Sequence, residues 1–318
     1  MRPIGPISAR DSTGAAGCNR QGWFVGIDPG DCPHNPLAYT AEHLKGRIRL
    51  PQETSKTGSG LPGLGALVRS LLAAREPLAL LLDFDGTLAR ICDRPGDARP
   101  EPAALTALNR MSADTPIAIV SGRGLDDLQT LIAIPRATFF GSHGQEARFP
   151  GGQTINPFGE SAPELGQLRG RIAAVAREFA GSWIEEKPQA LVLHYRNLRD
   201  QGKLPDLRRR IQILAGEFPE LSMMAGRKVF EFVPAAAPGK GGAVQWYLDR
   251  LDPGGNAPRI PVYFGDDVSD EGAFAAVDPL GIGVLVARRT RPTAAGYRLS
   301  GVNEVAAALT LLARWNAR

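Results

Sequence analysis

Cysteine and histidine are scarce in this chain, and long apolar runs are missing. Among 318 residues there are four histidines and three cysteines, which are Cys18, Cys32 and Cys92. Such few and scattered thiols exclude a disulfide framework and a zinc site, and they fit a reducing compartment. No run approaches the ~20 apolar residues that a membrane helix needs. Residues 1–30 also lack the basic start and apolar run of a secretory signal. We therefore expect a cytoplasmic protein that does not span a membrane.

Most of the chain also carries little net charge. The formal net charge is +4, and residues 1–76 alone carry nine basic and six acidic side chains. The remaining residues are therefore almost balanced in charge. This balance argues against a nucleic-acid-binding surface, which needs a strongly basic face.

The first 60 residues differ in composition from the rest of the chain. They are rich in Gly, Pro, Ser and Thr and show no sustained period of 2 or 3.6. A segment of this kind buries too little apolar surface to offset its ordering entropy, so we predict a disordered leader over residues 1–60. Residues 61–76 follow it with apolar side chains at helical spacing, from Leu64 to Leu72, which predicts an amphipathic helix.

From Pro77 onward, short apolar runs alternate with helix-like stretches. The runs are Leu78–Phe84, Ile117–Val120, Thr138–Phe140, Val229–Val233, Val262–Phe264 and Ile282–Val286, and the helix-like stretches include Pro102–Met111 and Leu125–Ile132. This alternation predicts an α/β fold with a doubly wound, Rossmann-like parallel sheet that helices cover on both faces. Ligands of such sheets bind beyond the carboxyl ends of the strands.

A segment with a different pattern interrupts this alternation. It contains helix-like stretches at Glu164–Phe179 and Leu204–Phe218, and strand-like stretches at Ala190–Tyr195 and Arg227–Phe232. We predict an inserted α+β cap domain over residues 145–232. The core domain would then consist of residues 61–144 and 233–318.

The strongest chemical signal is the pair of acids in Asp83-Phe84-Asp85-Gly86-Thr87, directly after an apolar run. Residues two apart on a strand point to the same side, so Asp83 and Asp85 should share one face at the end of the strand. Two carboxylates this close repel each other unless a cation or a proton intervenes. A capping acid and a turn would explain one of them but not both.

Three further polar motifs follow other parts of the predicted sheet. Ser121 and Gly122 follow the run Ile117–Val120, where a hydroxyl and a backbone N–H can bind a phosphoryl oxygen. Lys240 lies between glycines at a helix start and offers a positive charge for phosphate. The third motif is a cluster of oxygen side chains suited to Mg²⁺, namely Asp266, Asp267, Ser269, Asp270 and Glu271.

Taken in order, these motifs resemble those of the haloacid-dehalogenase-type phosphohydrolases. The matching segments read DFDGTL from Asp83, SGR from Ser121, PGKGG from Pro238 and GDDVSDEGAF from Gly265. Within that superfamily, residues 77–315 resemble the trehalose-6-phosphate phosphatases. The cues for this closer likeness are the segments Gly141–Glu146, Glu186–Pro188, His194–Arg196 and Gly226–Glu231. The resemblance implies a haloacid-dehalogenase-type core with a cap that determines substrate specificity.

The resemblance also implies a role for each motif residue. Asp83 would be the nucleophile and Asp85 the general acid and base. Mg²⁺ would be held by Asp83, the backbone carbonyl of Asp85 and Asp266, with Asp267 and Asp270 orienting this set. Ser121, Gly122 and Lys240 would bind the phosphoryl group. The residues expected to contact substrate are Arg123, His143, Gly144, Glu146, Lys187, His194, Arg196, Arg227 and Glu231.

The reaction implied is hydrolysis of a phosphoric monoester. The substrate would be trehalose 6-phosphate, cleaved through an aspartyl-phosphate intermediate as the last step of trehalose biosynthesis, with the synthase of that pathway as a candidate partner. Three alternatives stay open at this point. The cap could select another sugar phosphate, such as sucrose phosphate or mannosyl-phosphoglycerate. The chain could also be a non-catalytic sugar-phosphate sensor, or a mutase that transfers the phosphoryl group to a sugar instead of water.

Overall fold

The structure is a computed structural model that describes residues 60–74, 76–158, 163–187, 190–226, 228–235, 237, 239–251, 259–278 and 280–315. The leader predicted over residues 1–60 therefore lies outside the described residues, except for its last position. The amphipathic helix expected next is α2 (Leu64–Ala74). It buries Leu67, Val68 and Leu71 on one face, as their spacing predicts.

A mixed sheet of eight strands forms the core of the described chain. Its order is β12-β11-β10-β1-β2-β3-β4-β5, parallel from β12 to β3 and antiparallel beyond β3. The strands are β1 (Leu78–Leu82), β2 (Ile117–Val120), β3 (Thr138–Gly141), β4 (Glu146–Arg148), β5 (Thr154–Ile155), β10 (Ile260–Gly265), β11 (Ile282–Val286) and β12 (Tyr297–Leu299). The central strands are buried on both faces, which explains why they are continuously apolar in the sequence.

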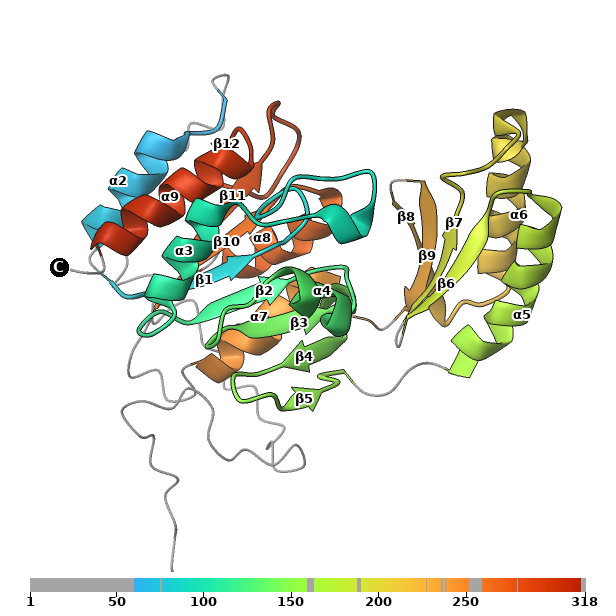
Figure 1. The fold of residues 1–318 in the computed structure, drawn as a ribbon, viewed down its shortest axis with the longest axis horizontal. Helices are drawn as coiled ribbons and strands as arrows, with labels where there is room; N and C mark the ends of the chain where they lie inside the picture. The colour runs from blue at the N-terminus through green and yellow to red at the C-terminus, as the bar shows by residue number, and fades with distance from the viewer. Residues whose placement is uncertain are drawn as a thin grey trace, which may run out of the picture. The chain divides into compact units, whose positions relative to one another are not determined.

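Helices cover both faces of this sheet (Figure 1). Alternate strand residues such as Leu80 and Leu82 pack on one face against α2, α3 (Pro102–Met111), α4 (Leu125–Leu131) and α9 (Val302–Trp315). On the other face, Tyr263 contacts Phe274 of α8 (Glu271–Val277), and Phe140 contacts Tyr247 of α7 (Gly239–Leu251). This is the predicted doubly wound arrangement. None of the described helices is long and apolar enough to cross a bilayer.

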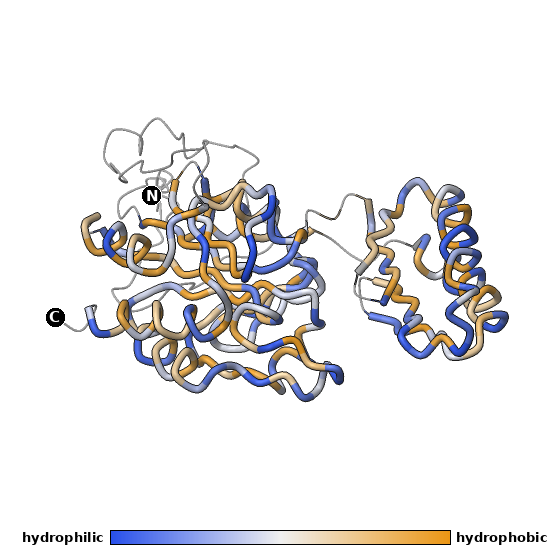
Figure 2. Tube along the Cα trace, turned by 90° about the horizontal axis from the view of Figure 1, so that it is seen from above, coloured by the Kyte–Doolittle hydropathy of each residue, from blue (hydrophilic) through white to orange (hydrophobic). Residues whose placement is uncertain are grey.

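The described residues of the cap form a four-stranded antiparallel sheet in the order β6-β7-β9-β8. Its strands are β6 (Trp183–Lys187), β7 (Ala190–His194), β8 (Leu221–Gly226) and β9 (Val229–Pro234). Helices α5 (Pro163–Glu178) and α6 (Leu204–Gly216) lie along one face (Figure 1), where a buried apolar cluster joins them to the sheet. Orange and blue alternate along these helices at the right of Figure 2, which is the amphipathic pattern of surface helices.

The strand-like run Val229–Val233 belongs to β9 of the cap sheet, as the predicted cap stretch ending at Phe232 indicates, and not to the core runs with which it was also grouped. The start of the cap differs from its predicted outline. Residues 146–155 hydrogen-bond to the core sheet as β4 and β5, because β3 returns antiparallel through the short helix η2 (Ser142–Gly144). We therefore propose to begin the cap after Ile155 rather than at residue 145.

Candidate active site

Two carboxylates meet at one edge of the core sheet because their strands are neighbours. Leu82 of β1 pairs in register with Phe264 of β10, and the chain continues from these strands to Asp83 and Asp266. The Asp83 N–H donates to the Phe264 carbonyl at 2.9 Å, which extends the parallel pairing by one residue. Asp83 is 3% exposed, so its carboxylate is held in a nearly water-free position.

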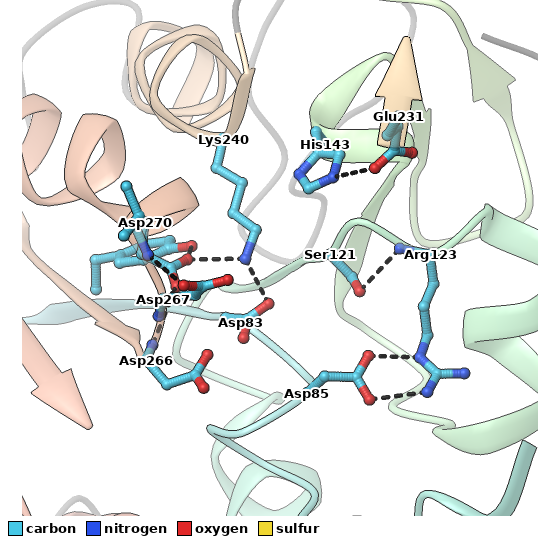
Figure 3. Close-up of polar contacts among 12 residues, drawn as sticks. Asp83, Asp85, Ser121, Arg123, His143, Glu231, Lys240, Asp266, Asp267 and Asp270 are labelled. Atoms are coloured by element: carbon cyan, nitrogen blue, oxygen red, sulfur yellow. Dashed lines mark hydrogen bonds and ion pairs between the residues drawn. The ribbon is translucent and has the colours of Figure 1, made fainter. Parts of the chain in front are cut away.

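Lys240 places a positive charge between two buried acids. It lies in the first turn of α7, and its Nζ donates to Asp83 Oδ1 at 2.7 Å and to Asp270 Oδ1 at 2.8 Å (Figure 3). Burial lowers the pKa of Lys240, but the two carboxylates outweigh burial and raise it above the usual value. Lys240 is therefore a fixed cation beside the predicted nucleophile.

Asp270 is fully buried and completely hydrogen-bonded. Its Oδ1 accepts from Lys240 and from the Tyr263 hydroxyl at 2.7 Å, and its Oδ2 accepts the backbone N–H groups of Asp266 and Asp267. With four donors around it, this carboxylate has little left to offer a ligand. It anchors the loop that carries Asp266 and fixes the position of Lys240.

The remaining carboxylate oxygens fit a hard divalent cation. Ligand oxygens of Asp83, Asp266 and Asp270 lie within 4.8 Å of one another. Burial and the nearby charges of Asp83 and Asp270 raise the pKa of Asp266 to about 9. Burial also raises the pKa of Asp83 to about 7, although Lys240 acts in the opposite direction. One lysine thus leaves the cluster short of positive charge, and Asp83 and Asp266 carry the oxygens that a metal ion could use.

Asp85 is bound to an arginine rather than to this cluster. Arg123 donates through Nε to Asp85 Oδ2 at 2.6 Å and through Nη2 to Asp85 Oδ1 at 2.8 Å, and Figure 3 shows the carboxylate turned toward the guanidinium. Arg123 also donates to Asp127 Oδ2 and to the Pro95 carbonyl, and it lies over the Phe84 ring. Asp85, the predicted general acid and base, is therefore held by a bidentate ion pair with Arg123, which lies on the loop after β2.

The loop after β2 also carries the predicted phosphate-binding residues. Ser121 is 1% exposed, and its Oγ accepts the Arg123 N–H at 3.2 Å. Gly122 lies directly against the His143 ring, since a Cβ at this position would come within 2.7 Å of two ring atoms. A larger residue at position 122 would displace His143. This close packing explains the glycine of the Ser-Gly-Arg motif.

A chain of polar contacts joins this loop to the cap. Lys187 Nζ of β6 donates to the Gly122 carbonyl at 3.2 Å and to Glu231 Oε1 at 2.9 Å, and Glu231 Oε2 lies 3.4 Å from His143 Nε2. His143 has a left-handed backbone, with φ 56°, which directs its ring into this contact. Burial raises the pKa of Glu231, but His143 and Lys187 outweigh burial and lower it to about 2. Glu231 is therefore a charged acid on the cap.

The other residues predicted from the sequence have varied surroundings. Asp267 is exposed and caps the turn at Val268, and Gly144 packs against Ala243 of α7. The partners of the rest are Ser142 Oγ for Glu146, Glu185 for His194 and the Asp93 carbonyl for Arg196. Arg227 lies outside the described residues.

Several residues in and around the site were not predicted. Tyr263 is hidden inside an apolar strand run, so its bond to Asp270 has no local signal in the sequence. Asp127 lies four residues after Arg123 on α4, a helical spacing that could have indicated the ion pair. Trp183 and Glu185 lie on β6, a strand whose charged and exposed residues conceal it.

Comparisons with known proteins agree with these motifs. Residues 81–303 match a family model described as trehalose-phosphatase. A trehalose-phosphate phosphatase of Mycobacterium bovis (strain BCG / Pasteur 1173P2) is 36% identical over 249 residues, which cover 76% of this chain and 63% of that protein. An uncharacterized glycosyl hydrolase of Mycobacterium tuberculosis (strain CDC 1551 / Oshkosh) is 37% identical over 241 residues, 73% of this chain and 18% of that protein. The chain thus matches less than two thirds of the length of these relatives.

A solved structure shares the fold as well. It is the C-terminal domain of the C. albicans trehalose-6-phosphate phosphatase, with a TM-score of 0.66 and 23% sequence identity. The match covers 81% of this chain and 99% of that domain.

Proposed function

The chain belongs to the trehalose-phosphatase family, and from that premise we propose that it hydrolyses trehalose 6-phosphate to trehalose and phosphate. The observation that carries this proposal is the convergence of Asp83, Lys240 and Asp266 at the carboxyl ends of β1 and β10. A buried carboxylate beside a fixed cation and a second, uncompensated acid is suited to phosphoryl transfer.

Asp83 is the proposed nucleophile. Lys240 holds the Asp83 carboxylate in place through its Oδ1, and an oxygen of this carboxylate would attack phosphorus. The bond from phosphorus to the sugar oxygen breaks as the aspartyl-phosphate bond forms. Water then attacks this phosphorus, releases phosphate and restores the carboxylate. The Lys240 ammonium and the Ser121 hydroxyl would stabilise the charge on the phosphoryl oxygens in both steps.

The residues present also fit Mg²⁺. We infer that Asp83 and Asp266 would hold the ion together with the backbone carbonyl of Asp85, while Asp267 and Asp270 orient the surrounding loop. Bound there, the ion would offset the repulsion between carboxylates and phosphate.

Asp85 would donate a proton to the leaving sugar oxygen and later take one from water. Its two-point pair with Arg123 uses both of its oxygens, so the side chain must turn away from the guanidinium to take this role. Both residues lie on loops at the edge of the sheet, where such a rotation needs no rearrangement of a strand. We infer that the approach of substrate phosphate competes for Arg123 and frees Asp85.

Specificity for the sugar would come from the cap and the neighbouring core loop. The polar groups of Lys187, Glu231 and His143 already contact one another in this part of the structure. A site lined with such groups rejects a substrate that lacks the matching hydroxyls, because its buried polar groups would lose their partners.

Phosphate release from trehalose 6-phosphate, with and without Mg²⁺, tests the proposal. We expect release that needs the metal and that is much faster than release from sucrose 6-phosphate, mannosyl-3-phosphoglycerate or glucose 6-phosphate. Equal rates on all of these compounds would defeat the specific assignment. Binding of trehalose 6-phosphate without any turnover would favour a sensor, and a phosphorylated sugar isomer as product would favour a mutase.

A further inference from the structure

The cap sheet has a second face that the two cap helices do not cover. Strand residues alternate between faces, so Leu191, Leu193 and Phe230 point into the apolar cluster under α5 and α6. The register places a different set on the opposite face, namely Trp183, Glu185, Lys187, Val192, His194 and Glu231. This face therefore holds Lys187 and Glu231, through which the cap contacts the core loops.

An aromatic pair lies at one end of this face. Trp183 and His194 are direct cross-strand partners, and their rings stack with centroids 4.5 Å apart and planes 3° from parallel. His194 Nε2 lies 2.7 Å from Glu185 Oε2, which fixes the imidazole beneath the indole. The pair is thus preorganised before any ligand arrives.

The exposure of this group differs from residue to residue. The His194 side chain is 18% exposed, whereas Trp183 is 40% exposed and the Glu185 side chain is 47% exposed. The indole therefore presents a flat apolar surface, with a carboxylate that has an accessible edge beside it. An exposed aromatic plane with a carboxylate beside it offers both an apolar and a polar contact to an amphipathic ligand.

A pyranose ring matches this surface. It has an apolar C–H face that packs on an aromatic plane, and hydroxyls at its rim that donate to a carboxylate. A phosphate group fits poorly here, because Glu185 would repel it. Trp183 and Lys187 are four residues apart on β6, or about 13 Å, which is longer than one pyranose ring. A sugar on Trp183 would thus be a different ring from the one that carries the phosphate near Lys187 and Gly122.

We propose that Trp183, stacked on His194 and bordered by Glu185, forms a sugar-stacking subsite for the unphosphorylated ring of a disaccharide phosphate. This inference rests on the proposed function for its choice of substrate. Trp183 would then discriminate a disaccharide phosphate from a monosaccharide phosphate. A cross-strand pair with a structural role alone would not change the preference for a disaccharide phosphate over a monosaccharide phosphate.

Calorimetric titration with trehalose tests the subsite without turnover. We expect Trp183→Ala to weaken binding ~tenfold, since a lost stacking contact has about this effect. Trp183→Phe keeps an aromatic plane and should bind within about threefold of the wild type. Ile213→Ala removes another exposed apolar side chain, on α6, and should leave binding unchanged. Equal binding by Trp183→Ala and the wild type, or no trehalose binding by the wild type, would overturn the inference.

Kinetics separate this inference from the proposed function. Trp183→Ala should lower kcat/KM for trehalose 6-phosphate ~tenfold, mainly through KM, and leave kcat/KM for glucose 6-phosphate unchanged. An equal loss on both substrates would assign Trp183 a structural role only and overturn the subsite. The other outcome is that the chain binds trehalose through Trp183 but releases no phosphate. That result would contradict the proposed function and still support the subsite.

Discussion

Gly86 and Asp266 are packed so closely that any side chain at position 86 would have to displace the Asp266 carboxylate. A Cβ on Gly86 would lie 2.0 Å from Asp266 Oδ2, and the Gly86 backbone has φ 88°, which L side chains rarely adopt. Gly86 of the DFDGTL segment thus leaves space for the carboxylate of Asp266, which follows strand β10. This contact links the first and last motifs of the sequence.

Gly86→Ala should therefore weaken Mg²⁺ binding at the proposed metal site. The added methyl group must push the Asp266 carboxylate away, and we expect Mg²⁺ affinity to fall ~10- to 100-fold, as it does when the surroundings of a ligand are disturbed. Mg²⁺ titration followed by phosphate release measures this change. Gly96→Ala is the control, since a Cβ there meets no atom within 4 Å. Similar Mg²⁺ affinity in both variants would show that Asp266 does not hold the ion.

Asp83→Asn should abolish turnover and spare substrate binding. The amide keeps the shape of the side chain and lacks the carboxylate oxygen proposed as nucleophile, so we expect kcat to fall by at least ~10³-fold. Phosphate release measures the rate, and calorimetry measures trehalose 6-phosphate binding. Undiminished turnover by this variant would exclude the covalent route.

Tyr263→Phe should loosen the buried Lys240–Asp270 pair. It removes one of the four donors around Asp270, and a hydrogen bond to a charged group contributes about 1.5–3 kcal/mol to stability. We expect the free energy of unfolding in urea to fall by about that amount, together with a lower kcat. Tyr297→Phe is a matched control, because its hydroxyl bonds the neutral Ser70 Oγ at 2.7 Å and not a carboxylate. Equal losses in the two variants would contradict a special role for Tyr263.

Glu231→Gln should alter how stability depends on pH. His143 and Lys187 overcome the effect of burial and lower the pKa of Glu231 from 4.5 to about 2, which corresponds to about 3 kcal/mol at most. A lowered carboxylate pKa stabilises the folded state above pH 4.5, and this contribution disappears as the pH falls toward 2. The wild type should therefore be more stable than the variant at pH 6, and the gap should narrow below pH 4.5.

Unfolding free energies measured from pH 6 to pH 2.5 test this expectation. Glu217→Gln serves as the control, because the Glu217–Arg171 pair is exposed and such pairs contribute about 0–1 kcal/mol. A gap between wild type and Glu231→Gln that stays constant over this range would show that Glu231 gains nothing from its partners.

Much of the core could be predicted from the sequence because its strands are buried on both faces. The runs Ile117–Val120 and Ile282–Val286 are strands with the predicted bounds, and Asp83 follows its strand as expected. The strand β6 was not predicted, because its exposed charged residues show no apolar pattern. The hydrogen bond between Lys240 and Asp83 was not predicted either, since it joins residues 157 positions apart and no local pattern encodes such a pairing.

The cap boundary was obscured for a related reason. Short antiparallel strands such as β4 and β5 contain few residues, and an alternating pattern of three residues is not distinctive. The antiparallel pairing of Phe139–Gly141 with Glu146–Arg148 assigns this segment to the core sheet, which the sequence pattern alone could not do.

The strand order has a consequence for how the chain is made. Strand β1 lies between β2, which follows it closely, and β10, which begins only at Ile260. During synthesis on the ribosome, the edge of β1 that pairs with β10 therefore stays unpaired until the whole cap has been translated. Late pairing of this kind slows folding and leaves an unpaired strand edge open to association with other nascent chains. Asp83 at the end of β1 thus gains its hydrogen bond to Phe264 of β10 only after the cap has been synthesised.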